Sequence, residues 1–127
     1  MAAVNALTKD GYDFAYIHVE APDEMGHQGS MKDKITAIER VDELVAGKIT
    51  EGMERAGADY RILVLPDHPT PIEVRTHTGD PVPYLLYDST APYEGTDVYD
   101  EKTASETGIY WPDGYKLIGH LLGRARS

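Results

Sequence analysis

The chain has 127 residues, of which 41% are hydrophobic, so it suits one compact domain with a core rather than a charged disordered chain. It contains no cysteine, which excludes disulfides, zinc ribbons and thiolate chemistry. Its formal net charge of −10 argues against a nucleic-acid partner, because phosphate backbones are bound by clustered Lys and Arg.

The first half of the chain predicts a strand, a loop and a long helix. Residues 12–20 (YDFAYIHVE) are rich in β-branched and aromatic residues and predict a buried strand. Residues 21–29 carry Pro, Asp and two Gly, which is typical of a loop. A capping-box pattern at Ser30 precedes apolar residues that recur every three or four positions. This pattern predicts an amphipathic helix that runs to about Ala56 and stops at Gly57.

The second half predicts shorter elements. Strands are expected at 60–65, 72–74 and 83–88, and helices at 105–110 and 113–124. Strands that alternate with helices indicate a layered α/β fold. In such folds ligands lie beyond the carboxyl ends of the strands. The loops that follow the strands at 12–20 and 60–65 are therefore placed where a site would form.

Those loops hold the candidate metal ligands. Asp23 and His27 follow the first predicted strand, Asp67 and His68 follow the second, and His77 lies a little further on. Carboxylate oxygen together with imidazole nitrogen suits Zn²⁺ or Mn²⁺, whereas Mg²⁺ and Ca²⁺ favour oxygen alone. The four-residue spacing puts Asp23 and His27 on one side of a turn.

Each motif also has an ordinary explanation. Asp and His are common turn residues, and a single Asp-x-x-Gly-His occurs often by chance. Neighbours in an extended segment point to opposite sides, so Asp67 and His68 share an ion only if the chain bends, which Pro66 and Pro69 favour. Arg75 is by default a surface arginine, with substrate contact as the alternative. The occurrence of both motifs after predicted strands, with a third histidine nearby, favours the metal site.

The same stretches resemble one family. YDFAYIHVEAPDEMGHQG, YRILVLPDHPTPIEVRTHTGDPVPYLLYDS and YDEKTASETG are similar to segments of archaeal-type cofactor-independent (2,3-bisphosphoglycerate-independent) phosphoglycerate mutases, which belong to the alkaline phosphatase superfamily. The resemblance runs from about Gly11 to Leu122, and the motifs fall in the family's order. It implies a partial three-layer α/β/α fold of the alkaline-phosphatase type.

The resemblance also implies a chemistry. These enzymes interconvert 3-phosphoglycerate and 2-phosphoglycerate in glycolysis and gluconeogenesis, through a phosphoenzyme formed on a serine or threonine. They use two divalent metal ions, with Mn²⁺ expected first and Zn²⁺, Mg²⁺ or Co²⁺ as alternatives. Carried over by position, Asp23, His27 and His77 correspond to the ligands of one ion. Asp67 and His68 correspond to part of the shell of the other.

Two parts of the family's machinery have no counterpart in these 127 residues. The family's nucleophile and a further Asp ligand come from an N-terminal segment, and its substrate-binding residues come largely from an inserted domain. We therefore expect a single domain, residues 1–127, that forms the C-terminal metal-binding portion of such an enzyme. On its own this chain is expected to be catalytically inactive.

Two other functions fit the same residues. One is a related two-metal phosphatase or phosphomutase, because the metal ligands barely distinguish the reactions of this superfamily. The other is a non-catalytic metal-binding module, or a homo-oligomer that covers a surface exposed by truncation. The expected partner is a phosphorylated small molecule. No apolar run approaches the roughly 20 residues that cross a bilayer, and a cytoplasmic protein without membrane contact is expected.

Overall fold

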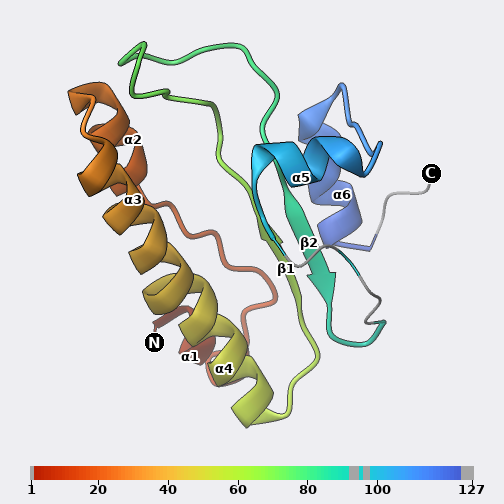
Figure 1. Ribbon diagram of the computed structural model, residues 1–127. Coiled ribbons are helices and arrows are strands. Elements are labelled where there is room, and N and C mark those ends of the chain that lie inside the picture. The colour runs from red at the N-terminus through yellow and green to blue at the C-terminus, as the bar shows by residue number, and fades with distance from the viewer. Residues whose placement is uncertain (1, 92–94, 96–97, 124–127) are drawn as a thin grey trace. The chain divides into compact units, whose positions relative to one another are not determined.

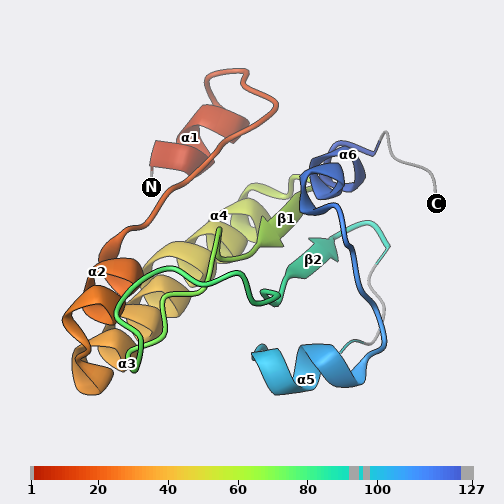
Figure 2. The same ribbon diagram turned by 90° about the horizontal axis from the view of Figure 1, so that it is seen from above.

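A computed structural model describes residues 2–91, 95 and 98–123 (Figures 1 and 2). The chain forms two compact units. The first comprises residues 1–59 and 68–80, and the second comprises residues 60–67 and 81–127.

The first unit is built on one long helical rod. Helix α3 (Met31–Arg40) continues through a π-helical turn (Val41–Ala46) into α4 (Gly47–Ala56), and two shorter helices precede it, α1 (Ala2–Thr8) and α2 (Ala21–Gln28). Ser30 caps the rod, because its side-chain oxygen accepts the Asp33 N–H at 3.3 Å. Gly57 ends the rod with a φ of 67°, the left-handed conformation typical of a helix C-terminus. The helix predicted here is thus confirmed together with both of its ends.

Burial along the rod is uneven. Ala37 and Met53 are buried, and α1 packs against α4 where Val4 lies over Gly52. A Cβ on Gly52 would lie 2.9 Å from a methyl carbon of Val4, so the absence of a side chain permits this approach. Ile38, by contrast, is 52% exposed. The predicted apolar stripe is therefore covered at the α4 end and open to solvent along α3.

Residues 12–20 do not form the predicted strand. They run without regular secondary structure, and Tyr16 within them is 77% exposed. β-branched and aromatic residues suit a strand, but a strand forms only when a neighbouring segment accepts its backbone hydrogen bonds. Within the described residues, only β1 and β2 pair in this way.

Residues 21–29 were predicted as a loop, and this prediction is wrong, since they form α2. Pro22 lies in the first turn, where its missing N–H has no cost, and Asp23 follows it, where the helix dipole favours a negative charge. Gly29 closes the helix at a φ of 69°. The same Pro, Asp and Gly that suggest a loop are thus the start and stop signals of a short helix.

The second unit contains a two-stranded sheet. Strands β1 (Arg61–Val64) and β2 (Leu85–Asp88) run antiparallel, with Arg61 opposite Asp88 and Val64 opposite Leu85. These are the strands predicted at 60–65 and 83–88, each shorter than expected. The unit also contains α5 (Glu101–Glu106), a 3-10 turn (Gly114–Lys116) and α6 (Leu117–Leu121).

The other second-half predictions are partly right. Of the helical turn expected at 105–110, only Ser105 and Glu106 are helical. Helix α5 begins earlier, at Glu101, because the Asp100 side chain accepts the Thr103 N–H at 2.7 Å and caps it there, and it ends at Glu106. The helix expected at 113–124 is confined to the 3-10 turn and α6; Leu122 and Gly123 form a turn, and Arg124 lies outside the described residues. The strand suggested at 72–74 is wrong, since these residues form a turn.

Asp88 makes the second unit sensitive to acid. Hydrogen bonds from the Thr90 hydroxyl (2.7 Å) and from Arg61 (2.8 Å) lower the pKa of Asp88 from 3.8 to about 2. A lowered pKa in the folded state means that the stabilisation is complete above pH 3.8 and is lost as the pH falls through 2.

We therefore expect Asp88→Asn to lower the urea midpoint of unfolding at pH 6. The difference in midpoint between wild type and variant should become smaller as the pH falls from 4 to 2, as measured by urea titration at each pH. Thr90→Val should reduce this pH dependence without abolishing it, because the Thr90 N–H also bonds to Asp88. An Asp88→Asn effect that is constant with pH would contradict the prediction.

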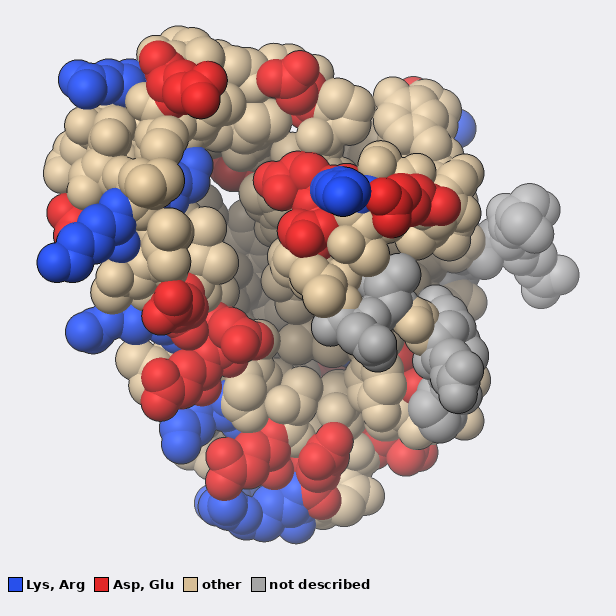
Figure 3. Space-filling model, viewed as in Figure 1, with Lys and Arg blue, Asp and Glu red and all other residues tan. Residues whose placement is uncertain are grey.

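The surface carries charges of both signs. Along the long helix of the first unit, basic and acidic side chains alternate (Figure 3). Over α5 of the second unit, acidic side chains flank a basic one. In the described part of the chain, no helix is both long enough and apolar enough to cross a membrane.

Candidate metal centre

Helix α2 supplies two of the predicted ligands. Asp23 and His27 are four residues apart and therefore lie on one face of the helix. The His27 Nε2 atom lies 3.3 Å from Asp23 Oδ2. The sequence analysis placed the two side chains on one side for the right reason, their spacing, although it assigned them to a loop.

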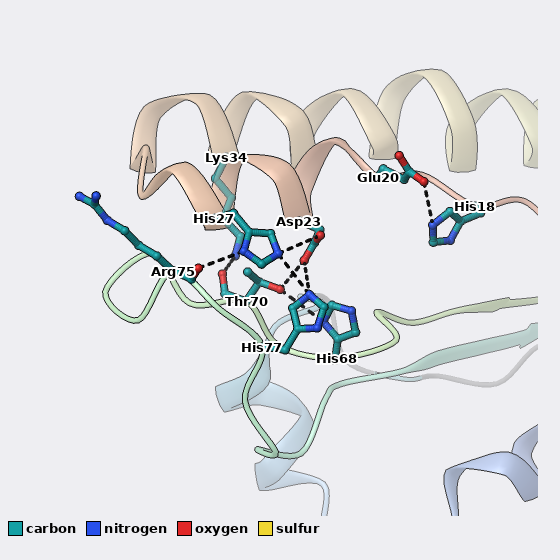
Figure 4. A network of polar contacts seen from close by, with 9 residues as sticks. All are labelled: His18, Glu20, Asp23, His27, Lys34, His68, Thr70, Arg75 and His77. Carbon is teal, nitrogen blue, oxygen red and sulfur yellow. Dashed lines mark hydrogen bonds and ion pairs between the residues drawn. The ribbon is translucent and has the colours of Figure 1, made fainter.

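The loop of residues 68–80 supplies the third. A helical turn at Pro71, where the Arg75 N–H donates to the Pro71 carbonyl at 2.8 Å, and a bond from the Thr78 N–H to the Pro69 carbonyl at 3.2 Å fold this loop. The folded loop directs His77 at α2 (Figure 4). His77 Nε2 lies 3.1 Å from Asp23 Oδ1 and 3.2 Å from His27 Nε2.

These three side chains form a triangle of donor atoms that fits a single cation. His77 Nε2 lies 3.1 Å from Asp23 Oδ1 and 3.2 Å from His27 Nε2, and His27 Nε2 lies 3.3 Å from the other carboxylate oxygen, Asp23 Oδ2. Donors about 2.1 Å from one tetrahedral ion are separated by about 3.4 Å, so these spacings are those expected of side chains that would share one ion. One carboxylate and two neutral imidazoles also leave a divalent ion with a net positive charge and with room for a further ligand. The residues present therefore fit a divalent metal.

The backbone holds His27 in a suitable tautomer. Its Nδ1 lies 3.0 Å from the Arg75 carbonyl, and a carbonyl can only accept, so Nδ1 carries the proton and Nε2 keeps its lone pair for the triangle. Arg75 has a φ of 60°, a left-handed conformation that is uncommon outside glycine. This conformation closes the turn at Pro71 and turns the Arg75 carbonyl towards α2.

The environment keeps Asp23 ionised. A hydrogen bond of 2.5 Å from the Thr70 hydroxyl lowers the pKa of Asp23; partial burial opposes this, and the nearby His27, His77 and His68 lower it further. The carboxylate form that a metal requires is therefore present well below neutral pH.

His68 lies beside the triangle, and Asp67 belongs to the other unit. The His68 ring stacks on His77 with centroids 3.5 Å apart, and its Nδ1 lies 3.3 Å from the Thr70 hydroxyl oxygen. Asp67 is an exposed residue of the second unit. The assignment of Asp67 and His68 to a second ion stays a prediction.

The Arg75 side chain points away from the triangle (Figure 4). It lies over Gly29, where a Cβ would come within 2.4 Å of the Arg75 Nε. Its contribution to the triangle is made by its backbone carbonyl, and the predicted substrate contact stays a prediction.

Two residues at the site were missed by the sequence analysis. Thr70 is buried and contacts Asp23, and Lys34 on α3 donates to the Thr70 carbonyl at 2.6 Å. The sequence does place Thr70 two residues after His68, within an unusual Pro-Thr-Pro segment. Lys34 and Thr70 are far apart in the sequence, and the helical pattern around Lys34 does not distinguish it from an ordinary surface lysine.

Comparisons with known proteins place the chain in a family of metalloenzymes. The family description "Metalloenzyme superfamily" matches residues 1–109. A 2,3-bisphosphoglycerate-independent phosphoglycerate mutase of Methanothrix thermoacetophila is 47% identical over 121 residues, which are 95% of this chain and 30% of the relative. A probable enzyme of the same name from Geobacter sulfurreducens is 46% identical over 124 residues, 97% of this chain and 30% of the relative.

A solved structure is also similar. The PH0037 protein from Pyrococcus horikoshii superposes with a TM-score of 0.76 at 29% identity, over 99% of this chain and 38% of that protein. The resemblance to cofactor-independent phosphoglycerate mutases is thus confirmed, as is the predicted fold class, an alkaline-phosphatase-like α/β fold present in part. The chain spans about 30% of the length of the mutases it matches. From the family match over most of its length, the chain belongs to the metalloenzyme superfamily.

Proposed function

We propose that this chain is the metal-binding portion of a cofactor-independent phosphoglycerate mutase, which interconverts 3-phosphoglycerate and 2-phosphoglycerate through a phosphoenzyme. The single observation that carries the proposal is the donor triangle of Asp23, His27 and His77. Independently of the site, the proposal is supported by the 47% identity of this chain to a phosphoglycerate mutase over 95% of its length. We propose Mn²⁺ as the ion, and the cytoplasm, where phosphoglycerate is metabolised, as the location.

Each residue of the triangle has its own role in this proposal. Asp23 neutralises part of the ion's charge, His27 presents a tautomer fixed by the Arg75 carbonyl, and His77 closes the triangle from the loop. Asp67 and His68 are proposed as part of a second site. Metal ions at such sites act as Lewis acids that stabilise the charge of a phosphoryl group and activate an oxygen nucleophile.

The proposal also accounts for how an acidic chain meets an anionic substrate. The net charge of −10 repels a phosphate ester over most of the surface. A divalent ion on a triangle with one carboxylate reverses the field locally. The substrate is therefore directed to this one place on the surface.

A segment exchange tests the proposal. The matching part of the Methanothrix thermoacetophila mutase is replaced by this chain, and the conversion of 3-phosphoglycerate is followed with Mn²⁺ present. We expect the chimera to produce 2-phosphoglycerate, and His77→Ala in the chimera to lower the rate at least about 100-fold, because a lost ligand costs more than the 10- to 100-fold of a lost outer partner.

The product separates the alternatives. A chimera that releases inorganic phosphate in place of 2-phosphoglycerate would favour the related phosphatase. A folded chimera that binds Mn²⁺ and has neither activity would favour the non-catalytic module. The 127-residue chain alone is expected to be inactive with Mn²⁺, and turnover by that chain that His27→Ala abolishes would contradict this.

A further inference from the structure

Thr70 occupies a distinctive position beside the donor triangle. It is 5% exposed, the one polar residue that is buried within the described part of the chain. Its hydroxyl oxygen lies 2.5 Å from Asp23 Oδ1 and 3.3 Å from His68 Nδ1. One buried hydroxyl thus bridges a ligand of the triangle and the neighbouring histidine (Figure 4).

The direction of both hydrogen bonds follows from the chemistry. A hydroxyl has one proton to donate and two lone pairs that accept. An ionised carboxylate can only accept, so the Thr70 proton goes to Asp23. The contact with His68 is then a hydrogen bond only if His68 Nδ1 is protonated and donates to the Thr70 oxygen.

We propose that Thr70 is a positioning residue of the metal centre, which orients the Asp23 carboxylate and holds His68 in the tautomer with its proton on Nδ1. That tautomer leaves the lone pair of His68 on Nε2, the form in which an imidazole binds a metal through Nε2. The inference rests on the proposed metal-binding function. It assigns a role to a residue that is not itself a ligand.

Thr70 is well held for this task. The Lys34 ammonium on α3 donates to its carbonyl at 2.6 Å. Gly26 of α2 lies against the same carbonyl, and a Cβ there would come within 2.3 Å of the carbonyl oxygen. Because two helices fix its backbone, the hydroxyl has a defined direction and its bonds cost little entropy to form.

Calorimetry with Mn²⁺ on the 127-residue chain tests the effect on binding. Thr70→Val keeps the shape and removes the hydroxyl, and it should weaken Mn²⁺ affinity about 10- to 100-fold, the usual cost of losing an outer partner of a ligand. Thr70→Ser restores the hydroxyl and should stay within about 3-fold of wild type. The matched control is Thr50→Val in α4, which should bind Mn²⁺ as wild type does. The Thr50 hydroxyl bonds to the backbone carbonyls of Ala46 and Gly47, one turn earlier in the helical rod.

A second measurement reports the tautomer without any metal. Long-range ¹H–¹⁵N spectra of the metal-free chain should show His68 protonated at Nδ1 in wild type and in Thr70→Ser, and a mixture or the other tautomer in Thr70→Val. Circular dichroism checks that each variant is folded. Should Thr70→Val fail to fold, the wild-type tautomer and the affinity of Thr70→Ser still decide the question.

Three results would overturn the inference. The first is a folded Thr70→Val variant that binds Mn²⁺ as tightly as wild type does. The second is a Thr70→Ser variant that binds Mn²⁺ as weakly as Thr70→Val does. The third is a wild-type spectrum in which His68 is protonated only at Nε2. A wild-type chain that binds no Mn²⁺ would contradict the proposed function instead, and the tautomer spectra would then decide the role of Thr70 alone.

Discussion

Alanine in place of His27 is expected to lower the Mn²⁺ affinity of the 127-residue chain by more than about 100-fold. His27 supplies one of the three donor groups of the triangle, and its Nε2 lies 3.2 Å from His77 Nε2 and 3.3 Å from Asp23 Oδ2. Loss of a partner outside the ligand shell already costs about 10- to 100-fold, so loss of a ligand should cost more. Calorimetric titration of the metal-free chain measures the change.

Thermal denaturation gives an independent measure. A ligand that binds only the folded state at 100 times its dissociation constant stabilises that state by about 2.7 kcal/mol. Wild type should therefore melt at a higher temperature with Mn²⁺, and His27→Ala should show little shift at the same concentration. His18→Ala is the matched control, because His18 pairs with Glu20 at 3.7 Å, apart from the triangle. If Mn²⁺ raised the melting temperatures of wild type and His27→Ala equally, His27 could not be a ligand of the ion.

The long helix could be predicted because its signals are local. The Ser30 cap, the recurring apolar residues and the Gly57 stop all act within a few residues of where they occur. The π-helical turn at 41–46 interrupts the rod without ending it, and no pattern in the sequence indicated it. Short-range rules thus determine where this helix begins and ends.

The strand at 12–20 could not be judged in the same way. A strand depends on a partner segment for its hydrogen bonds. Its own sequence shows only that the segment could form a strand, and does not show whether a partner is present. In α2 the opposite error occurred, because Pro22 and Gly29 are turn residues in general and helix-terminal residues here. Both errors come from residues that favour different secondary structures depending on the segments around them.

The nearness of Asp23 to His27 was predicted better than the element that carries them. The spacing of Asp23 and His27 brings the two side chains together in either a turn or a helix, so an error in the element did not disturb the ligand pair. The contact of His77 with them spans about fifty residues. The sequence indicated His77 as a candidate ligand, and only the family resemblance assigned it to the same ion as Asp23 and His27. Neither the residue spacing nor the family resemblance indicated a role for Thr70 and Lys34. Their contacts exist only after the loop of residues 68–80 has packed on α2 and α3.

The packing of the loop on α2 leads to the second large effect, that of Gly26→Ala. Alanine within a helix is normally favoured over glycine by up to about 1 kcal/mol. Here the added Cβ would lie 2.3 Å from the Thr70 carbonyl oxygen and 2.9 Å from its methyl carbon. The loop would have to move by roughly 1 Å to restore ordinary contact distances. We therefore expect a net loss of about 1–3 kcal/mol in the free energy of unfolding, the usual cost of overpacking.

The displacement should reach the metal site as well. Thr70 carries the hydroxyl that bonds to Asp23, and the same loop carries His77. A shift of the loop lengthens both contacts, so Gly26→Ala should weaken Mn²⁺ binding together with stability, as urea denaturation and calorimetry would measure. Gly79→Ala is the control in the same loop, because nothing lies within 4 Å of its Cβ position, and it should change neither quantity. If Gly26→Ala proved as stable as wild type, α2 and the loop could not be in the close contact that brings the three donors together.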